Sequence, residues 1–209
     1  MILHGYFRSS ASWRVRIALN LKGLTAEQVF HHLRRGEHRA PDYLALNPQG
    51  LLPALATDDG AVLTQSLAIC EYLDETCPEP PLLPAGALER ARVRAVAQAI
   101  ACDIHPVQNL KILQRLRDLK LPEEAVTAWA AQTIDEGLAA VDALLARSSG
   151  PFAFGDRPGL ADLCLVPQLG NARRFGVDLR WPRLTEIEAA CLELEAFRAA
   201  APSVQPDAE

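Results

Sequence analysis

Four prolines fall within Cys77–Pro84, and they separate two parts of the chain that differ in character. Proline removes a backbone donor and breaks a helix interior, so this stretch is predicted to be an extended linker that no helix crosses. Strand and helix signals alternate before it, whereas the sequence after it is rich in alanine and leucine with helical periodicity. The 209 residues therefore predict a small α/β domain over 1–80, a linker over 81–86 and an all-helical domain over 87–209.

The first domain begins with an apolar run, Met1–Phe7, that predicts a strand. The apolar periodicity of Trp13–Leu21 then predicts a helix that stops at Gly23. Further strands are expected over Glu27–Leu33, over Leu51–Ala56 and, after the hairpin signal Asp58-Asp59-Gly60, at Val62 and Leu63. This alternation is typical of a compact α/β domain.

Pro53 interrupts the expected third strand, where a proline cannot donate to the ladder. It therefore belongs either on a sheet edge or in a cis Leu52–Pro53 bond. In the second case the N–H and C=O of Leu52 would turn outward, towards the backbone of a ligand.

Helices are expected in the second domain over Ala87–Ala101, Pro106–Leu116, Pro122–Arg147, Leu160–Phe175 and Leu184–Ala200. The run Gly159-Leu160-Ala161-Asp162 resembles a capping box with glycine in place of serine or threonine. Glycine is an acceptable N-cap, so this helix should form with one reciprocal hydrogen bond fewer.

Composition excludes several classes of function. The net charge is −5 and no long basic run occurs, so neither nucleic acid nor an anionic membrane is an expected partner. Five scattered cysteines without C-x-x-C spacing indicate small buried side chains in a reducing compartment rather than disulfides or a zinc site. His31, His32 and His38 lack further ligands at metal spacing, so no metal is expected. Without a signal segment or an apolar run of about 20 residues, a cytoplasmic protein is expected.

The stretch Arg8-Ser9-Ser10-Ala11-Ser12-Trp13-Arg14 places three hydroxyls where the first strand leads into the first helix. One explanation is simple N-capping, which needs a single hydroxyl. The other is a binding site for an anion, because unpaired N–H groups and the helix dipole favour negative charge there. A thiolate is such an anion, and a serine that donates to it would lower the pKa of the thiol.

Three other groups of residues carry two interpretations each. Ser66, after Gln65, either caps the next helix or grips a carboxylate at its N-terminus. The polar residues of Asp103–Pro106 and Gln108–Lys111 either cap helices or line a site. The pair Arg173-Arg174 either forms a solvated face or supplies one arginine that holds a carboxylate through a bidentate fork.

Taken together, these motifs resemble the zeta class of the glutathione transferase family over essentially the whole chain. The segments that carry the resemblance are Tyr6–Leu19, Leu46–Pro48, Leu52–Leu55, Gln65–Ile69, Glu71–Leu73, Pro106–Leu110, Ala161–Gln168, Asn171–Phe175, Glu195–Phe197 and Gln205–Asp207. The first of them is specific to this class. The resemblance implies a thioredoxin-like glutathione-binding domain, an all-α second domain and a homodimer.

The resemblance also implies roles for individual residues. Ser9 or Ser10 would donate to the thiol of glutathione, and Leu52 would pair with the tripeptide backbone. Arg174, with Arg8 as second candidate, would hold the carboxylate of the substrate. The remaining positions implied to line the glutathione site are Ala11, Ser12, Trp13, Arg14, His38, Gln65, Ser66, His105, Asn109, Leu110 and Lys111.

The implied activity is the isomerisation of 4-maleylacetoacetate to 4-fumarylacetoacetate in tyrosine and phenylalanine breakdown. A carbon–carbon double bond rotates only after it loses its π character, which reversible addition of the glutathione thiolate would achieve. Three alternatives remain: isomerisation of maleylpyruvate in gentisate breakdown, conjugation or dehalogenation of α-halo acids, and glutathione binding without turnover. The family motif usually has cysteine where this chain has Ala11, so no protein thiol lies beside the glutathione sulfur.

Overall fold

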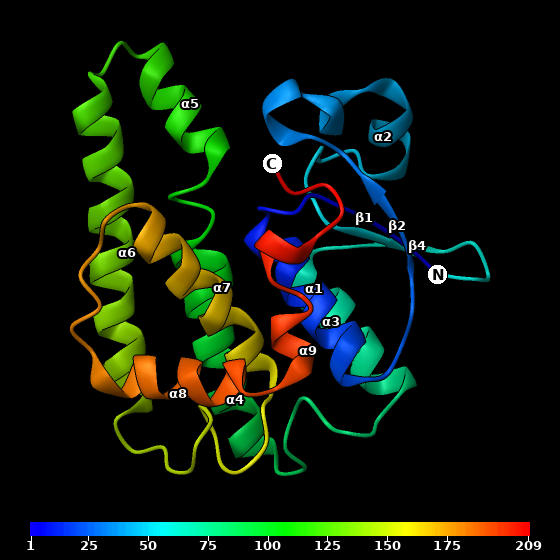
Figure 1. Cartoon of the computed structure of the whole chain (residues 1–209), viewed down its shortest axis with the longest axis vertical. Coiled ribbons are helices and arrows are strands. Elements are labelled where there is room, and N and C mark those ends of the chain that lie inside the picture. The colour runs from blue at the N-terminus through cyan, green and yellow to red at the C-terminus, as the bar shows by residue number, and fades with distance from the viewer. The chain divides into compact units, whose positions relative to one another are not determined.

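The computed structural model describes residues 1–209 and consists of two compact units, shown in Figure 1. The first unit comprises Met1–Leu82 together with Leu192–Glu209, and the second comprises Leu83–Cys191. The sequence groups residues 192–209 with the helical part, yet they fold against the first unit. Two hydrogen bonds explain this: Arg16 Nε donates to the carbonyl of Ala200 at 3.0 Å, and Asn20 Nδ2 donates to that of Ala196 at 2.9 Å.

A four-stranded sheet of order β2-β1-β3-β4 forms the centre of the first unit. Strand β1 pairs in parallel with β2 and antiparallel with β3, which pairs antiparallel with β4. The strands are β1 (Ile2–Gly5), β2 (Glu27–Phe30), β3 (Ala54–Ala56) and β4 (Val62–Thr64). The predicted α/β class is thereby confirmed, although β1, β2 and β3 are shorter than the ranges predicted for them and β4 is one residue longer.

Helix α1 (Ser10–Leu21) begins three residues before the predicted start at Trp13. The apolar periodicity sets in only at Trp13, whereas the cap that starts the helix is Ser9. The helix ends as expected at Gly23, whose φ of +65° suits glycine in a C-terminal turn. It packs beside α3 (Ser66–Thr76), as Figure 1 shows, so that the serine-rich turn lies at the edge of a rigid α/β layer.

A short helix and several turns complete the first unit. They are the 3-10 turns η1 (Leu33–Arg35) and η2 (Glu37–Arg39), helix α2 (Pro41–Leu46), helix α9 (Glu195–Arg198) and the 3-10 turn η4 (Pro202–Val204). The predicted turn before β3 is present, because the N–H of Gly50 donates to the carbonyl of Asn47 at 2.9 Å. The Leu52–Pro53 peptide bond is cis, in agreement with one of the two sequence-based interpretations.

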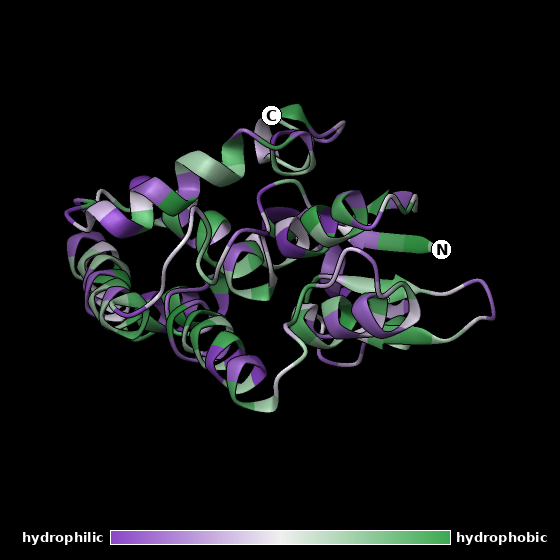
Figure 2. Ribbon diagram, turned by 90° about the horizontal axis from the view of Figure 1, so that it is seen from below, coloured by the Kyte–Doolittle hydropathy of each residue, from purple (hydrophilic) through white to green (hydrophobic).

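The second unit is helical, as the family resemblance and the periodicity predict. Its elements are α4 (Ala87–Gln98), the π-helical segment η3 (Ala99–Ile104), α5 (Leu110–Asp118), α6 (Glu123–Leu145), α7 (Leu160–Arg174) and α8 (Pro182–Leu192). Figure 2 shows apolar and polar patches alternating around these helices, as amphipathic helices require. Helix α7 is the exception, because nearly all its residues are buried.

Most helix boundaries in this part of the chain differ from prediction by one to three residues, and two differences are larger. Helix α5 begins at Leu110 rather than Pro106, since Asn109 caps it: Asn109 Oδ1 accepts from the Leu110 N–H at 2.7 Å. The helix expected over Leu184–Ala200 divides into α8 and α9, and Arg198 Nη1 donates to the carbonyls of Leu192 and Glu193 at the break. Side-chain donors thus replace main-chain ones at this break.

The N-terminus of α7 is filled by the helix's own acidic residue. Asp162, fully buried, accepts from the N–H groups of Gly159 and Ala153 at 2.8 Å each. Burial raises the pKa of Asp162 to about 6, while these hydrogen bonds oppose the shift. The capping box therefore works from the Asp162 side alone, as the glycine at position 159 predicts.

None of the five cysteines takes part in a disulfide. Cys70, Cys164 and Cys191 are buried, as expected, whereas Cys77 is half-buried and Cys102 is exposed, so the expectation of buried side chains holds for three of the five. Burial and the nearby Asp162 carboxylate raise the pKa of the Cys191 thiol. None of the helices combines the length and the apolar character that crossing a membrane would require.

Candidate active site

Ser9 caps α1, which is one of the two roles that the sequence left open, and its contacts leave room for the other. Its Oγ accepts from the Ser12 N–H at 3.1 Å, so it caps the helix. Because this bond uses only a lone pair of the hydroxyl, the Ser9 proton is still available for donation. The Ala11 N–H remains at the open end of the helix, and no acidic residue lies in the first turn. This end of α1 thus offers donors and a positive dipole without an anion of its own.

The other two serines of the turn lie deeper in the fold. Ser12 is fully buried behind the turn, and its Oγ would lie 3.4 Å from a Cβ added at Gly5 of β1. Ser10 is also buried, although it lies at the first position of the helix. Ser9 and Ser10 are therefore the hydroxyls closest to the open helix end, whereas Ser12 faces the sheet.

Arg14 is the most unusual charged residue of the first unit. Its side chain is 1% exposed, and its Nη1 donates to Ser66 Oγ at 3.2 Å. Its Nε and Nη2 have no hydrogen-bond partner. A buried cation without a counter-charge is unfavourable in the free protein and favours the arrival of an anion. Trp13, its neighbour, likewise has an indole Nε1 without a partner.

Of the two interpretations of Ser66, capping of α3 does not hold. The helix begins at Ser66 itself, because Gln65 takes the capping position with a φ of +69°. The Ser66 hydroxyl is therefore free of capping and accepts from Arg14 instead. Since a guanidinium can only donate, this contact leaves the Ser66 proton for an acceptor outside the protein. Gln65 Nε2 donates to Gln49 Oε1 at 2.9 Å, and the first turn of α3 contains no acidic residue.

Leu52 lies two residues before β3 and outside the sheet ladder, so its main-chain groups are not used by the sheet. Two bonds fix the preceding carbonyl: Tyr43 Oη donates to Leu51 O at 2.6 Å, and Asn47 Nδ2 donates to it at 2.8 Å. His38 lies in η2, half-buried, with no partner for its Nδ1. Burial, and secondarily Arg39 and His31, lower the pKa of His38, which keeps it neutral near pH 7.

The remaining candidates lie in the second unit. His105 follows η3, Asn109 is the N-cap of α5, and Leu110 and Lys111 begin that helix. For Asn109 the capping interpretation is correct. Lys111 is exposed and His105 half-buried.

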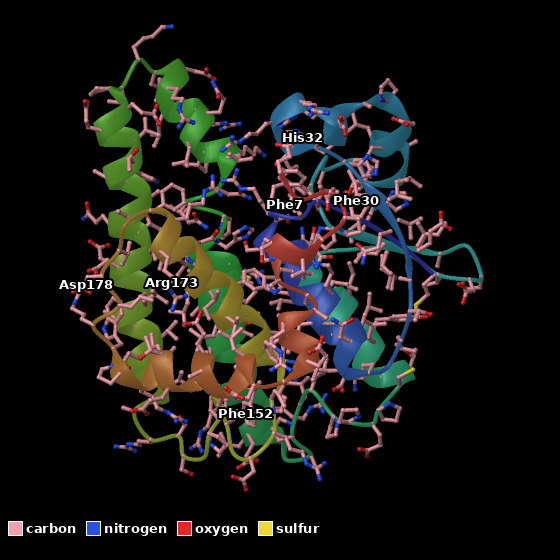
Figure 3. All side chains as sticks on the ribbon, viewed as in Figure 1. Phe7, Phe30, His32, Phe152, Arg173 and Asp178 are labelled. Atoms are coloured by element: carbon pink, nitrogen blue, oxygen red, sulfur yellow. The ribbon has the colours of Figure 1, made fainter.

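The structure distinguishes the two arginines between which the sequence could not choose. Arg173, labelled in Figure 3, forms a bidentate ion pair with the buried carboxylate of Glu188 on α8. Arg174 is exposed, with its guanidinium 5.3 Å from the centroid of the Phe175 ring. In the first unit, the Arg8 guanidinium lies 5.9 Å from the Phe7 ring. The guanidinium of Arg173 is thus used in an ion pair within the fold, whereas that of Arg174 lies at the surface beside Phe175.

Sequence reasoning missed two residues that hold the turn before α1, Arg16 and Asp207. Arg16 is 4% exposed and donates to three main-chain carbonyls, and Asp207 accepts from the Phe7 N–H at 2.9 Å. The signal for Arg16 was present, since it is a charged residue within the apolar run of the predicted helix. Asp207 lies 200 residues from its partner, and no local pattern reveals that contact.

The first unit therefore suits an extended, anionic, thiol-bearing peptide. Two helix N-termini without acidic residues are joined by the Arg14–Ser66 contact, and an unused stretch of main chain at Leu52 can pair with a peptide backbone. Glutathione has this combination of carboxylates, peptide groups and a thiol, and the buried unpartnered donors of Arg14 fit its anionic end.

Family models agree with this reading. Residues 8–76 match the glutathione S-transferase N-terminal domain, and residues 87–202 match the C-terminal domain. A curated relative, the maleylacetoacetate isomerase of Pseudomonas aeruginosa, is 50% identical over 99% of this chain and 98% of its own length.

Two solved structures extend the comparison. A holo structure of a maleylpyruvate isomerase, described as a bacterial glutathione S-transferase of the zeta class, matches with a TM-score of 0.96 and 49% identity over 100% of both chains. A maleylacetoacetate isomerase of Methylobacterium extorquens, solved with malonate and glutathione, matches with a TM-score of 0.96 and 41% identity, also over 100% of both chains. The chain therefore belongs to the glutathione S-transferase family, and within it to the zeta-class maleylacetoacetate isomerases, of which maleylpyruvate isomerase is a close relative.

Proposed function

We propose that this protein is a glutathione-dependent cis–trans isomerase that converts 4-maleylacetoacetate to 4-fumarylacetoacetate in tyrosine and phenylalanine breakdown. The observation that carries the proposal is the open N-terminus of α1, which has hydroxyl and amide donors but no acidic residue in its first turn. Such an end favours an ionised thiol, which the reaction requires.

Glutathione, when bound, supplies a thiolate that adds reversibly to the maleyl double bond, which becomes single and can rotate before the thiolate leaves. The chain needs only to hold that charge and to orient the reactants. Ser9 or Ser10 donates to the sulfur, and the dipole of α1 stabilises its charge. Because Ala11 replaces the family cysteine, hydroxyls, amides and the dipole carry this role alone.

Glutathione binding is assigned to the residues around the second open helix end. Ser66, whose oxygen accepts from Arg14, donates its proton to the γ-glutamyl carboxylate, while Arg14 provides the counter-charge. The main chain of Leu52 pairs with the peptide groups. The other residues implied by the family, among them Gln65, His38, His105, Asn109, Leu110 and Lys111, are proposed to line the same site.

Arg174 is proposed to hold the carboxylate of the substrate, with Arg8 as the second candidate. The commitment of Arg173 to Glu188 supports the choice of Arg174 over its neighbour. An arginine fork matches a carboxylate in geometry and charge.

A second candidate substrate is maleylpyruvate, because a maleylpyruvate isomerase is among the solved relatives with a TM-score of 0.96. Conjugation or dehalogenation of α-halo acids and glutathione binding without turnover are the further alternatives, and Ala11 is the residue that motivates the last of them. A homodimer and a cytoplasmic location belong to the proposal as well; sedimentation velocity on the purified protein tests the dimer.

The test is an assay of the purified protein with glutathione and, in turn, 4-maleylacetoacetate, maleylpyruvate and an α-halo acid. We expect loss of the enol absorbance of 4-maleylacetoacetate only when glutathione is present. Faster turnover of maleylpyruvate would transfer the assignment to gentisate breakdown. Tight glutathione binding without turnover of any substrate would leave a binding protein.

The role of Arg174 is tested with Arg174→Ala, for which we expect the KM for the maleyl substrate to rise about tenfold or more. Glutathione affinity should stay unchanged. Arg173→Ala is the matched control, because it breaks the Glu188 pair and should lower thermal stability without raising the substrate KM. A rise in KM in the control but not in Arg174→Ala would reject the assignment.

A further inference from the structure

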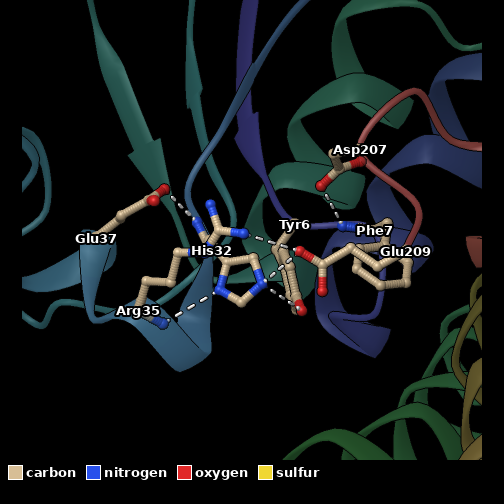
Figure 4. Close-up of polar contacts among 7 residues, drawn as sticks. All are labelled: Tyr6, Phe7, His32, Arg35, Glu37, Asp207 and Glu209. Carbon is tan, nitrogen blue, oxygen red and sulfur yellow. Dashed lines mark hydrogen bonds and ion pairs between the residues drawn. The ribbon is translucent and has the colours of Figure 1, made fainter.

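The segment Pro202–Glu209 lies against the residues that lead into the serine-rich turn at the start of α1. Its main contact is a hydrogen bond from the Phe7 N–H to Asp207 Oδ2 at 2.9 Å, drawn in Figure 4. Phe7 is buried and lies two residues before Ser9, the cap of α1. A carboxylate 200 positions later in the chain therefore holds the main chain just outside the first helix.

Arg16 binds the carbonyl groups of the same residues. Its Nη2 donates to Phe7 O at 3.0 Å, its Nη1 to Tyr6 O at 3.4 Å and its Nε to Ala200 O at 3.0 Å. Tyr6 O also accepts from the Ser9 N–H at 3.0 Å. Both main-chain polar groups of Phe7 are thus held, one by Asp207 and one by Arg16.

Asp207 and Arg16 also interact through their charges. Burial lowers the pKa of Arg16 to about 10, and the negative charge of Asp207 opposes that shift. The buried guanidinium of Arg16 therefore binds the carbonyl of Ala200, just before this segment, and has its counter-charge, Asp207, within it.

The segment itself has anchors that do not involve Asp207. Gln205 Nε2 donates to Ala199 O and Ala201 O, both at 2.9 Å. Glu209 Oε1 lies 3.1 Å from His32 Nε2 and 3.3 Å from Arg35 Nη2, as Figure 4 shows. Removing the Asp207 carboxylate should therefore leave the segment docked while releasing the amide of Phe7.

We propose that Asp207 is a positioning residue for the isomerisation: by accepting from the Phe7 N–H it fixes the turn that presents Ser9 and the α1 N-terminus to the sulfur of glutathione. This inference rests on the proposed function. Asp207 acts through the turn and touches neither glutathione nor substrate. Since a donor displaced by a fraction of an ångström loses much of its stabilisation of a charge, the effect falls on thiol ionisation and turnover rather than on binding.

The experiment compares Asp207→Ala with Asp207→Asn, whose amide oxygen can still accept from Phe7. We expect Asp207→Ala to lower kcat about three- to tenfold and to raise the pH at which bound glutathione ionises, followed by thiolate absorbance. Asp207→Asn should lie closer to the unaltered protein than Asp207→Ala does, because it keeps the acceptor for the Phe7 N–H and loses only the charge that faces Arg16. The exposed Glu193→Ala is the control for removal of a carboxylate from the same unit.

Three results would overturn the inference. They are an unchanged thiol titration in Asp207→Ala, a loss in Asp207→Asn as large as that in Asp207→Ala, and a fall in glutathione affinity and melting temperature that accounts for the loss of turnover. The titration needs no maleyl substrate. If the unaltered protein binds glutathione but turns over neither maleyl compound, the proposed function fails while the titration still decides the role of Asp207.

Discussion

Helix α7 begins with an acidic residue that folds back onto its own N-terminus, whereas α1 and α3 have no acidic residue in their first turns. Asp162, in the first turn of α7, accepts from the N–H of its N-cap Gly159 and from that of Ala153 in the preceding loop, and it is fully buried. At the start of α1, by contrast, Ser9 binds one amide and leaves Ala11 open. A helix N-terminus attracts negative charge in each case. At α7 the chain itself supplies the negative charge, whereas at α1 and α3 a ligand has to supply it. This difference separates a helix end that serves folding from one that is a candidate binding site.

Removing the carboxylate of Asp162 should have the largest effect, and that effect should fall on stability. Asp162→Ala leaves the N–H groups of Ala153 and Gly159 buried without partners, and each such loss costs about 1–3 kcal/mol. We expect the free energy of unfolding to fall by about 3 kcal/mol in urea denaturation. Glutathione affinity per folded molecule should stay the same. Asp156→Ala, an exposed acid in the same part of the chain, is the control and should change little.

The pH dependence of this variant follows from the pKa of Asp162, which burial raises from 3.8 to about 6. The folded protein then binds a proton more tightly than the unfolded chain, so this contribution to stability is present below about pH 4 and lost as pH rises through about 6. The difference in unfolding free energy between the unaltered protein and Asp162→Ala should therefore become smaller as pH rises from about 4 to about 6. A gap that widens would mean that the carboxylate is stabilised as an anion, as at an exposed cap.

For Arg14, between the two open helix ends, we expect the reverse of Asp162: a loss of glutathione affinity without a loss of stability. Arg14 binds Ser66 and has no counter-charge. Arg14→Met removes a buried cation, so the free protein should be no less stable than before, while glutathione should bind about tenfold more weakly. Calorimetric titration and urea denaturation measure the two quantities. Arg157→Met, on the exposed surface of the second unit, is the control. Loss of stability with unchanged glutathione affinity would make Arg14 a structural residue and would break the comparison.

The same contrast explains which features the sequence could predict. The strands, most helices and the Gly159 cap depend on neighbouring residues, and local patterns predicted them to within a few positions. They missed helix α2 and the break between α8 and α9. The cap of α3 was misplaced at Ser66, because the positive φ of Gln65 is not encoded by its residue type. The Ser66 hydroxyl, which does not cap α3, accepts from Arg14 instead, and this contact between two helices has no local sequence signal.

Long-range contacts set the limit for the site. The residue pattern alone did not separate Arg174 from Arg173, because the pairing of Arg173 with Glu188 joins two helices, and the bond from Phe7 to Asp207 spans 200 positions. Periodicity does not encode such pairs. The family resemblance named the candidate residues, Arg174 among them, and the fold showed which contacts each of them makes.

The smallest effect is expected from Gly159→Ser, which would complete the capping box of α7 that Asp162 forms from one side only. Gly159 has a φ of −139° and a ψ of −168°, an extended conformation that any residue adopts, so Gly159→Ser can supply an oxygen to the N–H of Asp162. Serine caps exceed glycine caps by only about 0.3 kcal/mol, which raises the melting temperature of a chain this size by about 1 °C. Gly159→Ala is the control, since it stiffens the unfolded chain equally but offers no acceptor. Equal stabilisation by alanine would show that the hydrogen bond is not the cause. Neither variant should change glutathione affinity, because this helix end already holds its own anion, whereas those of α1 and α3 do not.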